Sequence, residues 1–181
     1  MPMPTSSWID NIHRSHTVIA DDNILDLALV DETATEALAV RLSAAVGPGD
    51  VIALFGNLGM GKSVFARAFI RAYAGIDEEI PSPTFTLVQV YEADAAPIFH
   101  FDLYRLEAPE EALELGIEEA FVEGISLIEW PDRLGPWMPV NRLEIYLTTD
   151  GRESARRARL IGYGYWQARL IDGIGDGAMH G

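Results

Sequence analysis

One short segment constrains this chain more than any other: Gly56–Ser63, which reads GNLGMGKS. It matches G-x-x-x-x-G-K-[ST], the pattern of a phosphate-binding loop, or P-loop. The unbroken apolar run Val51–Phe55 comes directly before it and predicts a buried strand. A helix is predicted from Ser63 to about Tyr73. A strand, a glycine-containing loop and a helix in this order predict an α/β fold of the P-loop type.

The residue types of the loop fit the binding of a nucleotide with magnesium. Its glycines allow the backbone to curl, so that successive N–H groups point at phosphate oxygens. The following helix directs its positive end at the same phosphates. Lys62 is the only lysine in the chain, and it is expected to reach the β- and γ-phosphates. The Ser63 hydroxyl is expected to bind Mg²⁺, which prefers oxygen ligands.

The rest of the chain alternates between predicted strands and predicted helices. Further strands are expected at Ile24–Val30, Phe85–Tyr91, Ile98–Asp102, Ile125–Glu129, Leu143–Thr148 and Ala158–Ile161. Further helices are expected at Ala34–Val46, Glu110–Leu115 and Tyr163–Leu170. This alternation predicts a three-layer sandwich, with a central β-sheet between two layers of helices.

Length and composition set the domain organisation. The 181 residues favour one domain, which we expect over residues 23–171. Residues 1–22 carry no apolar core of a secretory signal and are expected to be a disordered extension. Residues 172–181 are glycine-rich and are expected to be a flexible tail.

The charge balance restricts the partners. With 28 acidic and 13 basic residues the formal net charge is −15, so tight direct binding of nucleic acid is not expected. A basic protein surface is a better match. The chain has no cysteine and no apolar stretch long enough for a membrane span. We therefore expect a cytoplasmic protein.

A P-loop needs an acid at the end of a neighbouring strand to complete its magnesium site. Glu129 ends the strand Ile125–Glu129 and Asp102 ends the strand Ile98–Asp102, so both are candidates. Trp130 follows Glu129 directly, where it would either pack in the core or form a wall of the site.

Two other groups of residues allow more than one interpretation. Ser82, Thr84 and Thr86 lie in a loop that begins at Pro81 and Pro83, after the predicted P-loop helix. They would either sense the γ-phosphate, as loops at this position do in P-loop switches, or form ordinary turn contacts. His100 alternates with two phenylalanines and is expected to be a packed or hydrogen-bonded strand residue rather than a metal ligand.

With these residues identified, the chain resembles the TsaE (YjeE) family of small bacterial ATPases. The likeness covers about residues 31–155 and depends on the order and spacing of several blocks. These are Gly56–Ser63, Ser82–Leu87 (SPTFTL), His100–Leu106 (HFDLYRL), Leu115–Ile117 (LGI), Ile128–Pro131 (IEWP) and Gly151–Glu153 (GRE).

The resemblance implies a P-loop fold with a partly mixed sheet. It also implies ATP hydrolysis that supports threonylcarbamoylation of adenosine 37 in tRNA, through a complex with the proteins TsaD and TsaB. Under this likeness Ser63 and Glu129 bind magnesium, and Lys62, Asp102 and Glu129 act in catalysis. The nucleotide-contacting residues would be Asp31, Thr35, Gly56, Asn57, Leu58, Gly59, Met60, Gly61, Lys62, Ser63, Val64, Trp130 and Arg152.

Two alternative functions remain open at the level of sequence. The first is a small-molecule kinase of the P-loop class, for which the arginines between 152 and 159 could serve as a lid. The second is a GTP-dependent switch. Guanine-binding P-loop proteins usually carry an N-K-x-D segment, and Lys62 as the only lysine excludes it.

Overall fold

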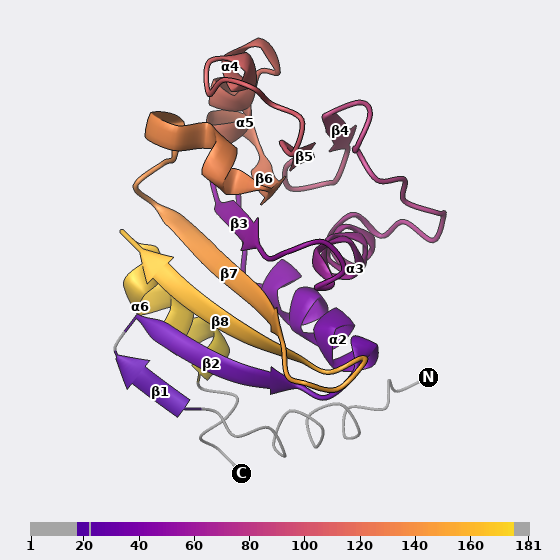
Figure 1. The fold of residues 1–181 in the computed structure, drawn as a ribbon. Helices are drawn as coiled ribbons and strands as arrows, with labels where there is room; N and C mark the ends of the chain where they lie inside the picture. Colours follow the sequence, from indigo (N-terminus) through magenta and orange to yellow (C-terminus); the bar gives the residue numbers. More distant parts are fainter. Residues whose placement is uncertain (1–17, 22, 176–181) are drawn as a thin grey trace.

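The computed structural model describes residues 18–21 and 23–175 of the chain. They form one eight-stranded sheet with helices packed on it (Figure 1). In chain order the strands are β1 (Val18–Asp21), β2 (Ile24–Leu29), β3 (Val51–Phe55), β4 (Val88–Tyr91), β5 (Ile98–Asp102), β6 (Ile125–Glu129), β7 (Arg142–Thr149) and β8 (Arg156–Tyr163). The α-helices are α2 (Glu32–Ser43), α3 (Lys62–Ala74), α4 (Glu111–Glu114), α5 (Ile117–Glu123) and α6 (Trp166–Leu170). A 3₁₀ segment η1 (Pro131–Trp137) and a π-helical turn η2 (Ile171–Gly175) complete the fold.

The sheet is mixed, as the resemblance implied. Its order is β1-β2-β8-β7-β3-β6-β5-β4. The central strands β7, β3, β6 and β5 run parallel to one another. Strand β4 on one side and strands β8, β2 and β1 on the other pair antiparallel with their neighbours. The carboxyl ends of β3, β5 and β6 therefore meet at one edge, where parallel sheets place their ligands.

Two apolar clusters pack on the sheet, which confirms the predicted three layers. One contains buried residues of α2, α3 and α6, such as Leu42, Phe69 and Trp166. The other joins α4, α5 and η1 to the strands β3, β5 and β6 through residues such as Ile117 and Leu134. The segment after the P-loop forms helix α3 because the apolar positions of its KSVFARAFIRAYA sequence recur at helical spacing.

The boundaries of the domain differ from those predicted. Val18–Asp21 forms β1 at the edge of the sheet, although it lies in the segment that was expected to be an extension. At the other end, η2 lies in the segment expected to be a tail. Ile174 is buried there, and its carbonyl accepts a 2.7 Å hydrogen bond from Arg41. This buried isoleucine was missed in the prediction from composition because the residues around it are rich in glycine. Residues 1–17, 22 and 176–181 lie outside the described residues.

One predicted strand starts later than expected. Phe85–Tyr91 alternates in polarity, but only Val88–Tyr91 pairs with β5. Leu87 has a left-handed backbone with φ of 65°, and its N–H donates to the Pro83 carbonyl at 2.7 Å. This turn breaks the strand geometry before the pairing begins.

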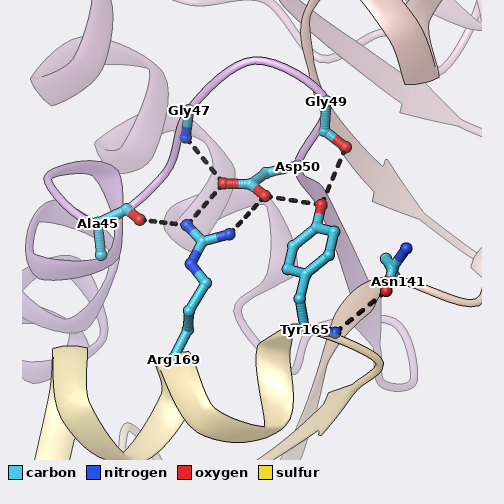
Figure 2. Close-up of polar contacts among 7 residues, drawn as sticks. All are labelled: Ala45, Gly47, Gly49, Asp50, Asn141, Tyr165 and Arg169. Atoms are coloured by element: carbon cyan, nitrogen blue, oxygen red, sulfur yellow. Dashed lines mark hydrogen bonds and ion pairs between the residues drawn. The ribbon is translucent and has the colours of Figure 1, made fainter.

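A polar cluster around the buried Asp50 connects α6 to the turn that precedes β3 (Figure 2). The Asp50 side chain accepts from the Arg169 guanidinium at 2.7 and 2.8 Å and from the Tyr165 hydroxyl at 2.9 Å. It also accepts from the Gly47 N–H at 2.8 Å, and Arg169 donates to the Ala45 carbonyl at 2.6 Å. Burial, and then the hydrogen bond to Asp50, raise the pKa of Tyr165 to about 12. The cluster closes the end of β3 that is opposite to the P-loop.

No helix in the described part of the chain is both long enough and apolar enough to span a membrane.

Candidate nucleotide-binding site

The loop Gly56–Ser63 has a backbone that only its glycines permit. Gly56 has φ of 152° and Gly61 has φ of 99°, both in the region that disfavours side chains. A Cβ atom on Gly56 would also lie 2.8 Å from the Leu147 carbonyl oxygen of strand β7. Gly61 ends the loop and caps the start of α3, so the amino end of this thirteen-residue helix faces the loop.

Lys62 is held inside the loop by the loop's own carbonyls. Its Nζ donates to the Gly56 carbonyl and, at 3.1 Å, to the Asn57 carbonyl. It also lies 4.3 Å from the centre of the Trp130 ring. Burial lowers the pKa of Lys62, against the opposing effect of nearby carboxylates, of which Glu129 is the largest. None of the ion pairs among the described residues involves this ammonium, so its charge is available to phosphate.

The two predicted acids lie side by side because β5 and β6 are adjacent and parallel, with Asp102 opposite Glu129 in register. Glu129 is buried, and its Oε1 lies 3.5 Å from the Ser63 hydroxyl. Its Oε2 lies 3.1 Å from Nε2 of His100. His100 is thus a buried, hydrogen-bonded strand residue, as predicted.

Asp102 is held differently from Glu129. Its Oδ2 accepts from the Thr84 hydroxyl at 3.3 Å, and its Oδ1 accepts from the Tyr104 N–H at 3.1 Å. The Thr84 hydroxyl also contacts the Ser82 hydroxyl at 2.7 Å. The loop from Ser82 therefore reaches the acid at the end of β5, which favours the site interpretation of Ser82 and Thr84 over the turn interpretation. Thr86 instead accepts from the Gln89 side chain at 3.1 Å.

Lys62, Ser63, Asp102 and Glu129 line one cleft of about 380 Å³. The cleft is also lined by other predicted residues, namely Leu58, Gly59, Gly61, Val64 and Trp130. Trp130 has a left-handed backbone with φ of 56°, a conformation that is strained for a bulky residue and is typical of functional sites. This backbone directs the ring over Lys62 and against Tyr104, whose ring centre is 4.9 Å away.

The side chains at the cleft fit a magnesium ion that is bound together with phosphate. Within the described residues, no group of three or more His, Cys, Asp or Glu side chains is arranged to hold a metal. The adjacent Ser63 and Glu129 side chains provide one hydroxyl and one carboxylate as oxygen ligands. Mg²⁺ commonly binds through one or two such groups together with substrate phosphates and water, so this pair suits a nucleotide-bound ion.

The remaining predicted residues lie at or beyond the margin of the cleft. Asp31 caps α2 and accepts from the Ala34 N–H at 2.8 Å. Thr35 is a buried residue of α2 that lies next to Gly61 of the loop. Met60 packs partly against the core. Arg152 is exposed and pairs with Asp150 at 3.6 Å; it is not among the residues that line the cleft.

Two cleft residues, Tyr104 and Arg105, were missed by the sequence argument. Glu32 lies between Asp31 and Thr35, which were both expected near the nucleotide, and Arg156 is one of the arginines that were considered as a lid. Arg156 donates from its guanidinium to the Gly59 carbonyl at 3.1 Å. It comes from the start of β8, and nothing in its spacing to the P-loop could indicate this contact. Tyr104 and Arg105 lie in the HFDLYRL block, directly after Asp102, and this position could have identified them.

Comparison with known proteins shows which family this chain belongs to. The family model described as "Threonylcarbamoyl adenosine biosynthesis protein TsaE" matches residues 29–158. The chain belongs to the TsaE family. The resemblance found in the sequence is thereby confirmed.

Individual members of the TsaE family are similar over different lengths. The tRNA threonylcarbamoyladenosine biosynthesis protein TsaE of Nostoc is 36% identical over 155 residues, which cover 83% of this chain and 93% of that protein. The Bacillus subtilis protein of the same name is 37% identical over 67% of this chain and 76% of its own length. The matches to the Rickettsia felis and Rickettsia conorii proteins are 44% and 45% identical but span only 62% and 59% of those proteins.

A solved structure has the same fold. The crystal structure of Bacillus subtilis YdiB superposes with a TM-score of 0.72 and 28% sequence identity. The superposition covers 84% of this chain and 95% of that one. The α/β fold with a mixed sheet is therefore that of a solved relative.

Proposed function

We propose that this protein binds ATP with Mg²⁺ in the cleft and hydrolyses it slowly. We further propose that hydrolysis supports threonylcarbamoylation of adenosine in tRNA through a complex with TsaD and TsaB. The observation that carries the proposal is the convergence of Lys62, Ser63, Asp102 and Glu129 on one cleft. These residues come from three separate elements, and together they supply a phosphate-binding cation, two oxygen ligands and a further acid.

Each of these side chains has a separate role in the proposal. The loop N–H groups and Lys62 bind the phosphates. Ser63 and Glu129 hold magnesium, and the bound ion stabilises negative charge on the phosphate oxygens. Asp102 orients the attacking water. The Thr84 hydroxyl and the Tyr104 N–H hold its carboxylate in place for this role. Trp130 closes one side of the cleft over Lys62.

Slow hydrolysis by the isolated chain follows from comparison with other P-loop switches. In such proteins a partner's contribution raises the rate by roughly 10³–10⁵. The net charge of −15 also favours tRNA binding by the partner proteins rather than by this chain, because a chain this acidic does not bind tRNA tightly by itself at physiological salt. The partner proteins then contact the tRNA.

ATP turnover measured with and without the TsaD–TsaB complex tests the proposal. We expect slow hydrolysis by the chain alone, a clear rise on addition of the complex, and weaker binding of GTP than of ATP. Turnover of tens per second that ignores the complex would contradict the proposal. Phosphate transfer to one of a panel of metabolites would instead support the small-molecule kinase.

A further inference from the structure

Phe85 is the most exposed of the large hydrophobic side chains in the described part of the chain. Its exposed fraction is 81%. It lies in the loop from Ser82 to Leu87. The Leu87 N–H donates to the Pro83 carbonyl within this loop, and the Asp102 N–H donates to the Leu87 carbonyl, which ties the carboxyl end of the loop to β5. A single exposed apolar side chain is ordinary on a protein surface, so the surroundings of this ring decide whether it marks an interaction site.

Arg105 lies over this exposed ring. Its guanidinium carbon is 4.5 Å from the Phe85 ring centre. The chain has 28 acidic residues against 13 basic ones, yet none of the ion pairs found within the described residues involves Arg105. An arginine without an ion-pair partner in so acidic a chain leaves a positive charge beside an apolar ring. We call these two side chains the Phe85–Arg105 tip.

The tip is connected directly to the cleft. Thr84, the neighbour of Phe85, donates to Asp102 at 3.3 Å. Tyr104, the neighbour of Arg105, donates its N–H to the other oxygen of Asp102 at 3.1 Å. Both contacts that hold the proposed catalytic acid therefore come from residues next to the tip. A displacement of the tip by a bound partner would move Asp102.

We propose that the Phe85–Arg105 tip docks into a protein partner whose surface offers an apolar pocket with carboxylates at its rim. Docking there positions Asp102 and so controls the rate of hydrolysis. The inference rests on the proposed function, since it names the surface through which the partner acts on the same site.

The chemistry of the tip points to a protein partner rather than to the nucleotide. Phe85 does not line the cleft, whereas its neighbour Thr84 and the other member of the tip, Arg105, do. The aromatic ring is therefore the part of the tip that lies outside the nucleotide cleft. Aromatic residues and arginine are the types that dominate binding energy at protein interfaces. Leu58 and Tyr104, which line the cleft, are also exposed large hydrophobic side chains, so a partner that covers the cleft would find further apolar surface there.

The test compares Phe85→Ala with Val122→Ala by measuring the affinity of each variant for the TsaD–TsaB complex in the presence of ATP and Mg²⁺. Val122 is matched in exposure, at 77%, and lies on α5 away from the cleft lining. We expect Phe85→Ala to weaken the affinity by at least about tenfold and Val122→Ala to leave it within twofold. Nucleotide affinity of the isolated chain should stay unchanged in both.

A second variant tests the charge of the tip. Arg105→Met keeps an apolar side chain over Phe85 but removes the charge. The affinity for the complex should fall, and it should depend less on salt than that of the parent chain. Equal affinity and equal salt dependence in Arg105→Met would contradict the carboxylate rim.

The two levels of the proposal fail in different ways. If the parent chain and Phe85→Ala bind the complex equally well, the tip is not the docking surface, while the proposed function stands. If the parent chain does not bind the complex at all, both the partner assignment and this inference are wrong. If Phe85→Ala weakens nucleotide binding by the isolated chain as strongly as it weakens partner binding, the ring belongs to the nucleotide site and the inference is overturned.

Discussion

Buried carboxylates lie at both ends of strand β3, and they differ in how closely their hydrogen-bond partners hold them. At the amino end, Asp50 accepts four hydrogen bonds of 2.7 to 2.9 Å from Arg169, Tyr165 and Gly47. At the carboxyl end, the contacts that hold Glu129 and Asp102 are longer. They are 3.5 Å to Ser63, 3.1 Å to His100, 3.3 Å to Thr84 and 3.1 Å to the Tyr104 N–H.

This difference separates a structural cluster from a binding site. A buried carboxylate with short, complete contacts to a guanidinium contributes to holding one element on another. Buried charges with long contacts are costly to the folded state unless a ligand completes them. We therefore assign the amino end of β3 mainly to stability, and the difference supports the proposal that the carboxyl end binds phosphate and a cation.

The largest effect is expected at the carboxyl end. Asp102→Asn should lower partner-stimulated turnover by roughly 10² or more, because a residue that positions the attacking water acts mainly in the transition state. Affinity for ATP with Mg²⁺ should stay within a few-fold. Single-turnover kinetics beside a nucleotide titration measure both. A large loss of affinity would mean that Asp102 binds the nucleotide or its metal.

The opposite end should respond in stability. Asp50→Asn leaves Arg169 without its carboxylate, and we expect the free energy of unfolding to fall by about 2–3 kcal/mol. This is less than for a fully buried pair, because the Arg169 side chain is 36% exposed. Urea denaturation measures the change.

Asp26→Asn is the matched control for Asp50→Asn. Its pair with Arg159 has similar geometry, at 2.8 Å, but lies in a more exposed position. We expect a change below about 1 kcal/mol. Nucleotide affinity should be unaltered in both variants. Equal destabilisation by the two substitutions would remove the distinction drawn for Asp50.

Lys62→Ala should weaken nucleotide binding by at least about tenfold, since it removes a charge-assisted contact to phosphate. The free energy of unfolding should stay equal or rise, because the change also removes a buried, desolvated ammonium. Arg71→Ala on the same helix removes an exposed positive charge and should change neither quantity. If Lys62→Ala unfolds the protein and Arg71→Ala does not, Lys62 has a structural role.

Among the residues at the carboxyl end of β3, His100 should have the smallest effect. It contacts Glu129 but is not expected to touch the nucleotide. His100→Leu should weaken magnesium-dependent nucleotide affinity several-fold, whereas His100→Gln, which keeps a donor, should recover most of it. Magnesium-free affinity should not change. Equal behaviour of the two variants would show that His100 acts only through packing.

The local features of this protein could be predicted from sequence, because their signals lie within a few residues. The strand Val51–Phe55, the loop Gly56–Ser63 and the acids that end β5 and β6 are examples. Each follows from an apolar run that stops at a polar residue or a glycine. The pairing of β5 with β6 then brings Asp102 and Glu129 together.

The features that could not be predicted depend on tertiary contacts. Arg156 reaches the Gly59 carbonyl across 97 residues of sequence, and Ile174 is buried although glycines surround it. Val18–Asp21 becomes a strand only because β2 offers it an edge. Leu87 interrupts an alternating segment through its left-handed backbone, which a sequence pattern of period two does not reveal.

The central claim, that the carboxyl end of β3 binds ATP with magnesium, is tested most directly by titrating ATP into Glu129→Gln and into the parent chain, each with and without Mg²⁺. Glu129→Gln keeps the size and the polarity of the side chain but removes the charge next to a hard cation. The account predicts that magnesium strengthens ATP binding in the parent chain and that this gain is largely lost in Glu129→Gln. An equal magnesium gain in both proteins, or no ATP binding by the parent chain, would contradict it.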